Sequence, residues 1–228
     1  NQKIIFFFKF IHMSNIVESF NKIKSNIENL KPTKQVNIVA VSKTFSLEHI
    51  KPLIDYGHNH FGENKVQEAK SKWQDLKKKN QNLNLHMIGK LQSNKAKDAI
   101  ELFDYIHSLD NQKLADILSK TQKNTNKFLK YFIQVNLANE TQKSGISVND
   151  LDGFYNYCTR EKYLEVVGLM IIPPNNDDSK KYFQLLDNLN KNLALKELSM
   201  GMSSDYLEAV KFNSTFVRVG SQIFGQRT

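Results

Sequence analysis

The chain has 228 residues, 40% of them hydrophobic, and a formal net charge of +9. This length fits one large domain or two small ones. The single cysteine, Cys158, excludes an intrachain disulfide and gives no cluster of metal ligands, so we expect a reducing, cytoplasmic setting. No apolar run approaches the roughly 18 residues of a membrane span, and we therefore expect no membrane partner.

The positive charge comes almost entirely from lysine. There are only three arginines, Arg160, Arg218 and Arg227. Proteins that read nucleic acids depend on arginine together with stacking aromatic residues. We therefore interpret the lysines as a solvated surface and predict no specific nucleic-acid partner, although a basic nucleic-acid-binding protein remains an alternative.

Residues 1–12 form a short apolar stretch that Lys9 interrupts. A signal peptide would have a longer apolar core and a small-residue cleavage site. Because Met13 precedes an amphipathic pattern, we expect the native start at Met13. We interpret 1–12 as a non-native or disordered leader and 13–228 as one domain.

The first predicted element is an amphipathic helix, which Pro32 ends. Its apolar residues recur at three- and four-residue spacing: Ile16, Phe20, Ile23, Ile27 and Leu30. Eight short apolar runs then predict strands at 36–41, 58–61, 85–88, 105–108, 128–135, 166–172, 197–200 and 216–219. Helical patterns lie between them at 47–54, 66–76, 96–103, 111–122, 151–158, 182–193 and 206–210.

Strict alternation of strands and helices implies a parallel sheet. Eight such units favour an α/β fold with a single (β/α)8 TIM-type barrel and an extra N-terminal helix. An open, doubly wound sheet is the alternative. However, no Gly-rich dinucleotide fingerprint follows the first predicted strand, where the sequence reads Ser-Lys-Thr-Phe-Ser.

The first predicted strand ends in Lys43, which is an unusual place for a lysine. An ammonium group is costly to desolvate, so lysine is seldom buried unless it is paired or used. Desolvation also favours the neutral amine, which can act as a nucleophile or form a Schiff base. The alternative is that Lys43 reaches solvent at the strand end.

Active sites of such barrels lie at the carboxyl ends of the strands. The polar and sulfur-containing side chains found at or near these ends, with one glycine, are Lys43, Asn64, His86, Ser108, Asn136, Met170, Ser199, Met200, Ser203, Arg218, Gly220 and Ser221. His86 can equally be a hydrogen-bonded core histidine. No spacing of His, Asp and Glu suggests a metal site.

The loops after the last two strands combine glycine and serine ahead of helices, at 201–204 and 219–221. Barrels commonly bind phosphate at this place. Each loop alone could be an ordinary helix N-cap. Together with Lys43 they favour a phosphorylated carbonyl ligand. Arg218 alternates with valines in the last strand, so it either pairs with a carboxylate or donates to the ligand's ring nitrogen or phosphate.

Six motifs in this order resemble the pyridoxal phosphate homeostasis proteins, whose fold is similar to the N-terminal barrel of alanine racemase. Lys65 departs from the pattern, because the family usually has an aromatic residue there. The motifs are V-A-V-S-K-T at 39–44, F-G-E-N-K-V-Q-E at 61–68, H-M-I-G-K-L-Q-S-N-K at 86–95, G-L-M at 168–170, L-S-M-G-M-S at 198–203 and V-R-V-G-S-Q-I-F-G at 217–225.

The resemblance implies a protein that binds pyridoxal 5′-phosphate (PLP) and serves intracellular PLP, or vitamin B6, homeostasis. It implies a Schiff base on Lys43 and phosphate contacts from Ser203, Gly220 and Ser221. It also implies that Arg218 lies near the pyridine nitrogen. The residues that would line the pocket are Asn64, His86, Met170, Ser199 and Met200.

We expect no strong catalysis. An arginine beside the pyridine nitrogen keeps it unprotonated and weakens the electron sink that amino-acid chemistry needs. Similar racemases bring a second base from another domain, and we expect none after Gly225. The alternatives are a racemase-like enzyme and a Schiff-base aldolase. We expect a monomer, with PLP-dependent apo-enzymes as candidate partners.

Overall fold

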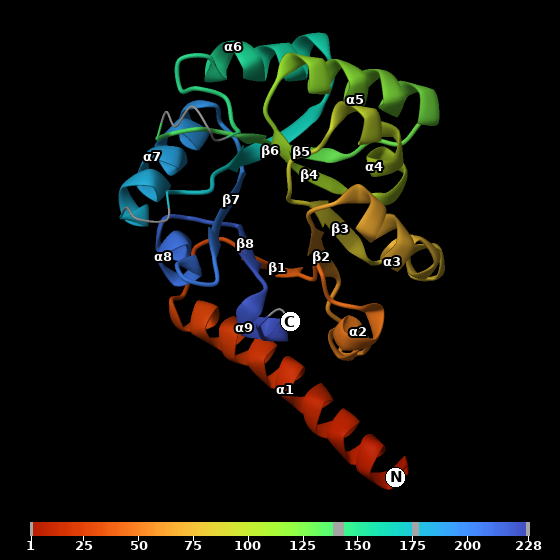
Figure 1. The fold of residues 1–228 in the computed structure, drawn as a ribbon. Helices are drawn as coiled ribbons and strands as arrows, with labels where there is room; N and C mark the ends of the chain where they lie inside the picture. The colour runs from red at the N-terminus through yellow and green to blue at the C-terminus, as the bar shows by residue number, and fades with distance from the viewer. Residues whose placement is uncertain (1, 139–143, 175–177, 227–228) are drawn as a thin grey trace.

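Eight parallel strands close into a barrel in their sequence order (Figure 1). The computed structural model describes residues 2–138, 144–174 and 178–226, with side chains from residue 15 onward. The closed barrel confirms the predicted fold and excludes the open sheet. The strands are β1 (Asn37–Val41), β2 (His60–Glu63), β3 (Asn84–Met87), β4 (Tyr105–Leu109), β5 (Lys130–Gln134), β6 (Glu165–Met170), β7 (Glu197–Met202) and β8 (Phe216–Val219).

Helices surround the strands on the outside of the barrel, as Figure 1 shows. They are α1 (Gln2–Asn29), α2 (Leu47–Asp55), α3 (Val66–Lys79), α4 (Ala96–Leu102), α5 (Gln112–Thr125), α6 (Leu151–Asn156), α7 (Ser179–Asn192), α8 (Tyr206–Lys211) and α9 (Ser221–Phe224), with short turns η1 (Ser93–Lys95) and η2 (Tyr157–Glu161). Helix α1 packs beside α2, α8 and α9.

The predicted and observed elements differ mainly at their ends. The second strand was predicted at 58–61 but starts at His60. Gly57 makes a turn at φ 97°, and the ring of His58 bonds the carbonyl of His60 at 2.8 Å. His58 is therefore part of the connection and not of the strand.

The barrel separates two apolar layers. The inner layer consists of Val39, Phe132, Met170 and Phe216, whereas the larger outer layer fills the space between strands and helices. Because side chains alternate along a strand, Val39 and Val41 point inward and Ala40 points outward. Continuing this alternation beyond β1 directs Lys43 toward the mouth of the barrel.

The predicted leader at 1–12 stays a prediction, since the side chains before residue 15 lie outside the described part of the structure. From there on, α1 buries one face, with Ile16, Phe20, Ile23 and Ile27 each at most 6% exposed. Within the described ranges, no helix has both the length and the apolar character needed to cross a membrane.

Candidate functional site

Lys43 is half-buried directly after β1, two residues beyond Val41. Helix α3 and strand β2 hold the backbone around it. Lys72 donates to the carbonyl of Ser42 at 2.9 Å, and the carboxylate of Glu68 accepts from the N–H of Thr44. The chain is therefore fixed on both sides of Lys43.

The support behind Lys43 centres on Glu63, whose side chain is fully buried. Its Oε1 accepts from Ser42 Oγ at 2.7 Å, from Lys72 Nζ at 3.0 Å and from Trp73 Nε1 at 2.9 Å, whereas Oε2 has no partner in the structure. Burial raises the pKa of Glu63, and the charge of Lys72 opposes this shift. We call Glu63, Glu68 and Lys72 the charged support of Lys43.

Arg218 lies on β8 and is only 5% exposed. Its guanidinium donates to Ser199 Oγ at 2.6 Å and to the carbonyl of Ile171, at the mouth end of β6, at 2.8 Å. Among the described residues, no ion pair joins Arg218 to a carboxylate; burial lowers its pKa to about 10, and the more distant charge of Asp205 opposes this shift. Of the two roles considered for Arg218, the salt bridge is thus not found within the described ranges.

The two loops predicted to bind phosphate meet at the mouth. The N–H of Gly220 donates to Ser203 Oγ at 3.4 Å, and the hydroxyls of Ser203 and Ser221 lie 3.3 Å apart. Gly220 packs against β1, because an added Cβ would lie 3.1 Å from the carbonyl oxygen of Val41. This close approach brings both loops to the edge from which Lys43 follows.

The remaining predicted residues occupy different environments. Asn64 borders a cavity of about 390 Å³ at the mouth, together with Gly89, Asn136 and Ile171. Met170 belongs to the inner apolar layer, but Met200 belongs to the outer one. Met200 therefore lies on the opposite face of β7 from Ser199, and pocket-lining roles for the two methionines stay predictions.

His86 lies inside the barrel, fully buried, and is part of a feature that the sequence analysis missed. Its ring nitrogens lie 2.9 Å from His60 Nδ1 and 2.9 Å from His107 Nε2, and His107 Nδ1 lies 2.7 Å from Ser199 Oγ. One signal was available: inward-facing histidines recur on three consecutive strands. The predicted pocket-lining role of His86 stays a prediction.

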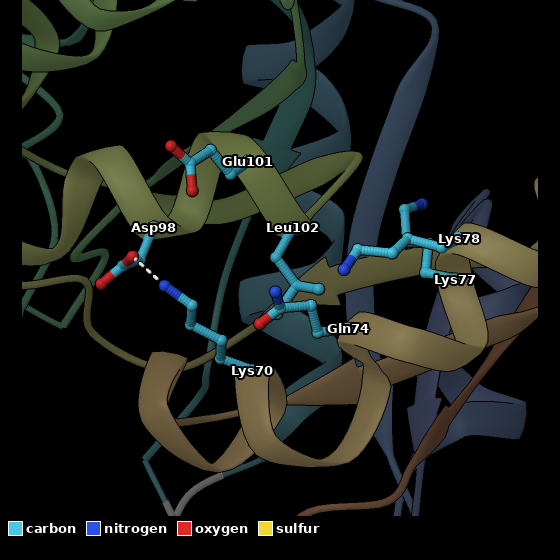
Figure 2. A pocket seen from close by; sticks show the side chains of 7 residues that line it. All are labelled: Lys70, Gln74, Lys77, Lys78, Asp98, Glu101 and Leu102. Atoms are coloured by element: carbon cyan, nitrogen blue, oxygen red, sulfur yellow. Dashed lines mark hydrogen bonds and ion pairs between the residues drawn. The ribbon is translucent and has the colours of Figure 1, made fainter.

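A separate groove of about 270 Å³ lies between α3 and α4 (Figure 2). It contains side chains of both charges, and Lys70 pairs there with Asp98 at 2.6 Å. None of the predicted site residues lines it. The groove belongs to the outer helices, whereas the residues described above converge on the mouth and interior of the barrel.

A lysine amine, a buried guanidinium and two loops of N–H and hydroxyl donors thus share one end of the barrel. The amine can form a Schiff base with an aldehyde. The loops offer the donors that a phosphate group requires. The uncompensated guanidinium favours a ligand that brings an acceptor or a negative charge.

Comparison with known proteins agrees with this chemistry. The family model described as alanine racemase, N-terminal domain, matches residues 19–228. The pyridoxal phosphate homeostasis protein of Pasteurella multocida is 36% identical, with 93% of this chain and 97% of the relative covered. That of Schizosaccharomyces pombe is 34% identical, with 94% of both covered.

Solved structures share the fold of this chain. The structure of PipY from Synechococcus elongatus with PLP bound has a TM-score of 0.83 and 34% identity, covering 92% of this chain and all of that one. Alanine racemase from Clostridium difficile shares the fold, with a TM-score of 0.72 and 13% identity, covering 93% of this chain and 57% of that chain.

Proposed function

Because the chain belongs to the pyridoxal phosphate homeostasis protein family, with the alanine racemase N-terminal fold, we propose that it binds PLP at the mouth of its barrel. In this role it serves the intracellular balance of the cofactor. The residues proposed to form the PLP site are the ten that the family motifs single out. Lys43, Arg218 and the two loops would contact the cofactor, and the proposal rests on their convergence on one end of the barrel.

Lys43 is the covalent anchor in this proposal. Its amine would hold PLP through the aldehyde carbon, as a Schiff base formed with the loss of one water molecule. The charged support holds the backbone on both sides of Lys43 and so limits the positions that its side chain can sample. A fixed anchor of this kind lowers the entropy lost when the ligand is bound.

The buried guanidinium of Arg218 is the structural observation that carries the proposal. A buried cation with only a hydroxyl and a carbonyl as acceptors is unfavourable unless a ligand completes its environment. The pyridine nitrogen of PLP is such an acceptor. Ser203, Gly220 and Ser221 supply donors for the phosphate.

We propose that catalysis is weak or absent. PLP supplies an electron sink, which works best when its ring nitrogen is protonated. Arg218 only donates hydrogen bonds, so it holds that nitrogen in the unprotonated state. Addition of L-alanine or L-glutamate to the purified protein is therefore expected to give no racemisation or transamination at ordinary enzyme rates, and such turnover would contradict this part of the proposal.

Partners and location follow as further proposals. PLP-dependent apo-enzymes would receive the cofactor, and the protein would act as a cytoplasmic monomer. The sequence offers a single cysteine, Cys158, as is usual for a reducing compartment. Light scattering of the loaded protein checks the oligomeric state.

The decisive experiment locates the attachment. The protein is loaded with PLP, reduced with borohydride and digested, and mass mapping identifies the modified lysine. We expect the adduct on Lys43 and loss of the visible absorbance of the Schiff base in Lys43→Ala. The matched control is Lys90→Ala, which removes an exposed lysine from the same mouth. An adduct elsewhere would overturn the assigned anchor.

A further inference from the structure

An unbroken line of polar side chains crosses the apolar interior of the barrel. It starts at His60, the first residue of β2, passes through His86 and His107, and reaches Ser199 and Arg218. The contacts between neighbours measure 2.9, 2.9, 2.7 and 2.6 Å. All members after His60 are at most 5% exposed. We call this line the histidine chain.

The direction of the hydrogen bonds follows from Arg218. A guanidinium has only donors, so Ser199 Oγ accepts from it. The hydroxyl proton of Ser199 has one other neighbour within the described residues, His107 Nδ1. Ser199 therefore donates to His107, whose proton must lie on Nε2. The same reasoning places the proton of His86 on Nε2, directed at His60 Nδ1.

The reverse direction leaves a buried group unsatisfied. If His107 donated from Nδ1, Ser199 would accept from two donors, and its own proton would have no acceptor among the described residues. Burying an unpaired hydroxyl proton is unfavourable. The charge of Arg218 also disfavours the doubly protonated, positively charged form of His107, which would carry a proton on Nδ1 as well.

Both central histidines are held neutral. Burial lowers the pKa of His86 and of His107 well below the usual value, with a further contribution from His107 on His86 and from Arg218 on His107. The other titratable groups that face the chain are Asp104 and Lys77, which pair with each other near His60, His58, which acts on His86, and Asp205, whose negative charge acts on Arg218. The described residues hold no cluster of His, Cys, Asp or Glu suited to a metal ion.

We propose that the histidine chain is the positioning device for Arg218. Its neutral Nε2–H tautomers fix the hydroxyl of Ser199 as an acceptor, and Ser199 with the carbonyl of Ile171 aims the guanidinium at the mouth. This inference rests on the proposed function, since the group at which Arg218 is aimed is the ring of PLP. Ser199 and the histidines act through Arg218 and do not themselves need to touch the cofactor.

The first test needs no cofactor. In the apo protein labelled with ¹⁵N-histidine, NMR is expected to find His86 and His107 neutral between pH 6 and 8, with the proton on Nε2. Ser199→Ala should convert His107 to a mixture of tautomers, because its Nδ1 then loses its donor. A proton on Nδ1 of His107 in the unchanged protein would overturn the proposed direction of the chain.

The second test measures PLP affinity and the Schiff-base spectrum. Ser199→Ala should weaken binding about tenfold, the effect of losing one hydrogen bond to a charged group. His107→Asn keeps an acceptor near the Nδ1 position and should stay within about threefold of the unchanged protein, whereas His107→Phe should approach Ser199→Ala. The absorbance band of the bound cofactor should move only in the two weakened variants.

Phe132→Leu is the matched control. Its ring stacks on His107 at 4.3 Å between centroids but makes no hydrogen bond, so the variant disturbs packing and leaves the chain intact. Equal losses in His107→Asn, His107→Phe and Phe132→Leu would show that packing alone matters and would refute the positioning role. If the unchanged protein binds no PLP, the proposed function itself fails, a result distinct from either outcome.

Discussion

Lys43 and Arg218 approach the same barrel mouth but are held by different kinds of groups. Behind Lys43, outside the barrel wall, the charged support bonds the backbone through Glu68 and Lys72, while Glu63 accepts from the hydroxyl of Ser42 and pairs with Lys72. Behind Arg218, inside the barrel, every contact is with a neutral acceptor. Charge thus supports the backbone at the lysine and is absent from the contacts of the arginine.

This difference separates stability from ligand affinity. A carboxylate and an ammonium that are buried together depend on each other, so removal of one leaves the other uncompensated. Arg218 has no carboxylate in direct contact among the described residues and is compensated only by the more distant charge of Asp205, so part of the free energy of its burial can be recovered when a ligand binds. We expect variants of the charged support to affect folding, and variants on the Arg218 side to affect binding.

The largest effect is expected for Lys72→Met. The side chain of Lys72 is 8% exposed and its ammonium pairs with the fully buried Glu63. The variant therefore leaves a buried carboxylate without its cation. Loss of one partner of a buried pair destabilises a protein by about 3–5 kcal/mol. Urea unfolding of the apo protein measures this change.

Two further variants make the Lys72 result specific. The double variant Lys72→Met/Glu63→Gln should recover part of the lost stability, because no charge then remains buried. Lys70→Met, which opens the exposed pair with Asp98, should leave the unfolding midpoint unchanged. If Lys70→Met and Lys72→Met behaved alike, the buried pair would not be the source of the effect.

The barrel and the position of Lys43 at its mouth were predictable from the sequence, but the contacts behind them were not. The regular alternation of strands and helices predicts the barrel, and its strand ends collect Lys43, Ser203 and Gly220 at one mouth. Met200, which lies in the outer layer, shows one limit of prediction from the sequence. Residues adjacent in a strand point to opposite faces, and a motif alone does not say which face is inward.

The histidine chain marks a second limit. His86 was considered alone, because a sequence does not give the stagger that brings β3, β4 and β7 together inside a barrel. His107 lies one residue before Ser108, and the sequence pattern identifies only Ser108 as a strand-end residue. Likewise, the sequence predicts the lysines as a solvated surface, and only the packing of α3 against β2 and the residues after β1 shows that Lys72 is buried there.

Lowering the pH should reduce the free energy of unfolding mainly through the buried histidines behind Arg218. In the unfolded chain a histidine has a pKa near 6.5, whereas burial holds the pKa of His86 and His107 lower in the folded protein. Below pH 6.5 the unfolded state therefore binds more protons than the folded state, and stability is lost as the pH falls. Well below pH 6.5 the slope contributed by each such histidine approaches about 1.4 kcal/mol per pH unit.

The slope can be assigned by substitution. Urea unfolding of the apo protein at pH 7.5, 6.5 and 5.5 gives the pH dependence, and His107→Asn should reduce the stability lost between pH 7.5 and 5.5 by about 1.4 kcal/mol in total, since one titrating group is removed. The pKa of Glu63 is also shifted. Because Glu63 is present in both the unchanged protein and His107→Asn, its contribution cancels when their stabilities are compared. An identical slope in both proteins would show that His107 does not stay neutral in the folded state.

The smallest expected change in stability comes from Arg218→Met, but its sign is the most informative. Because no carboxylate of the described residues pairs with the guanidinium, replacing it by an apolar chain should stabilise the apo protein by about 1 kcal/mol. The same variant should weaken PLP binding at least tenfold. Arg160→Met, at an exposed arginine outside the barrel, should change neither quantity. A large loss of apo stability in Arg218→Met would mean that the arginine is retained for folding, and the contrast with the charged support of Lys43 would disappear.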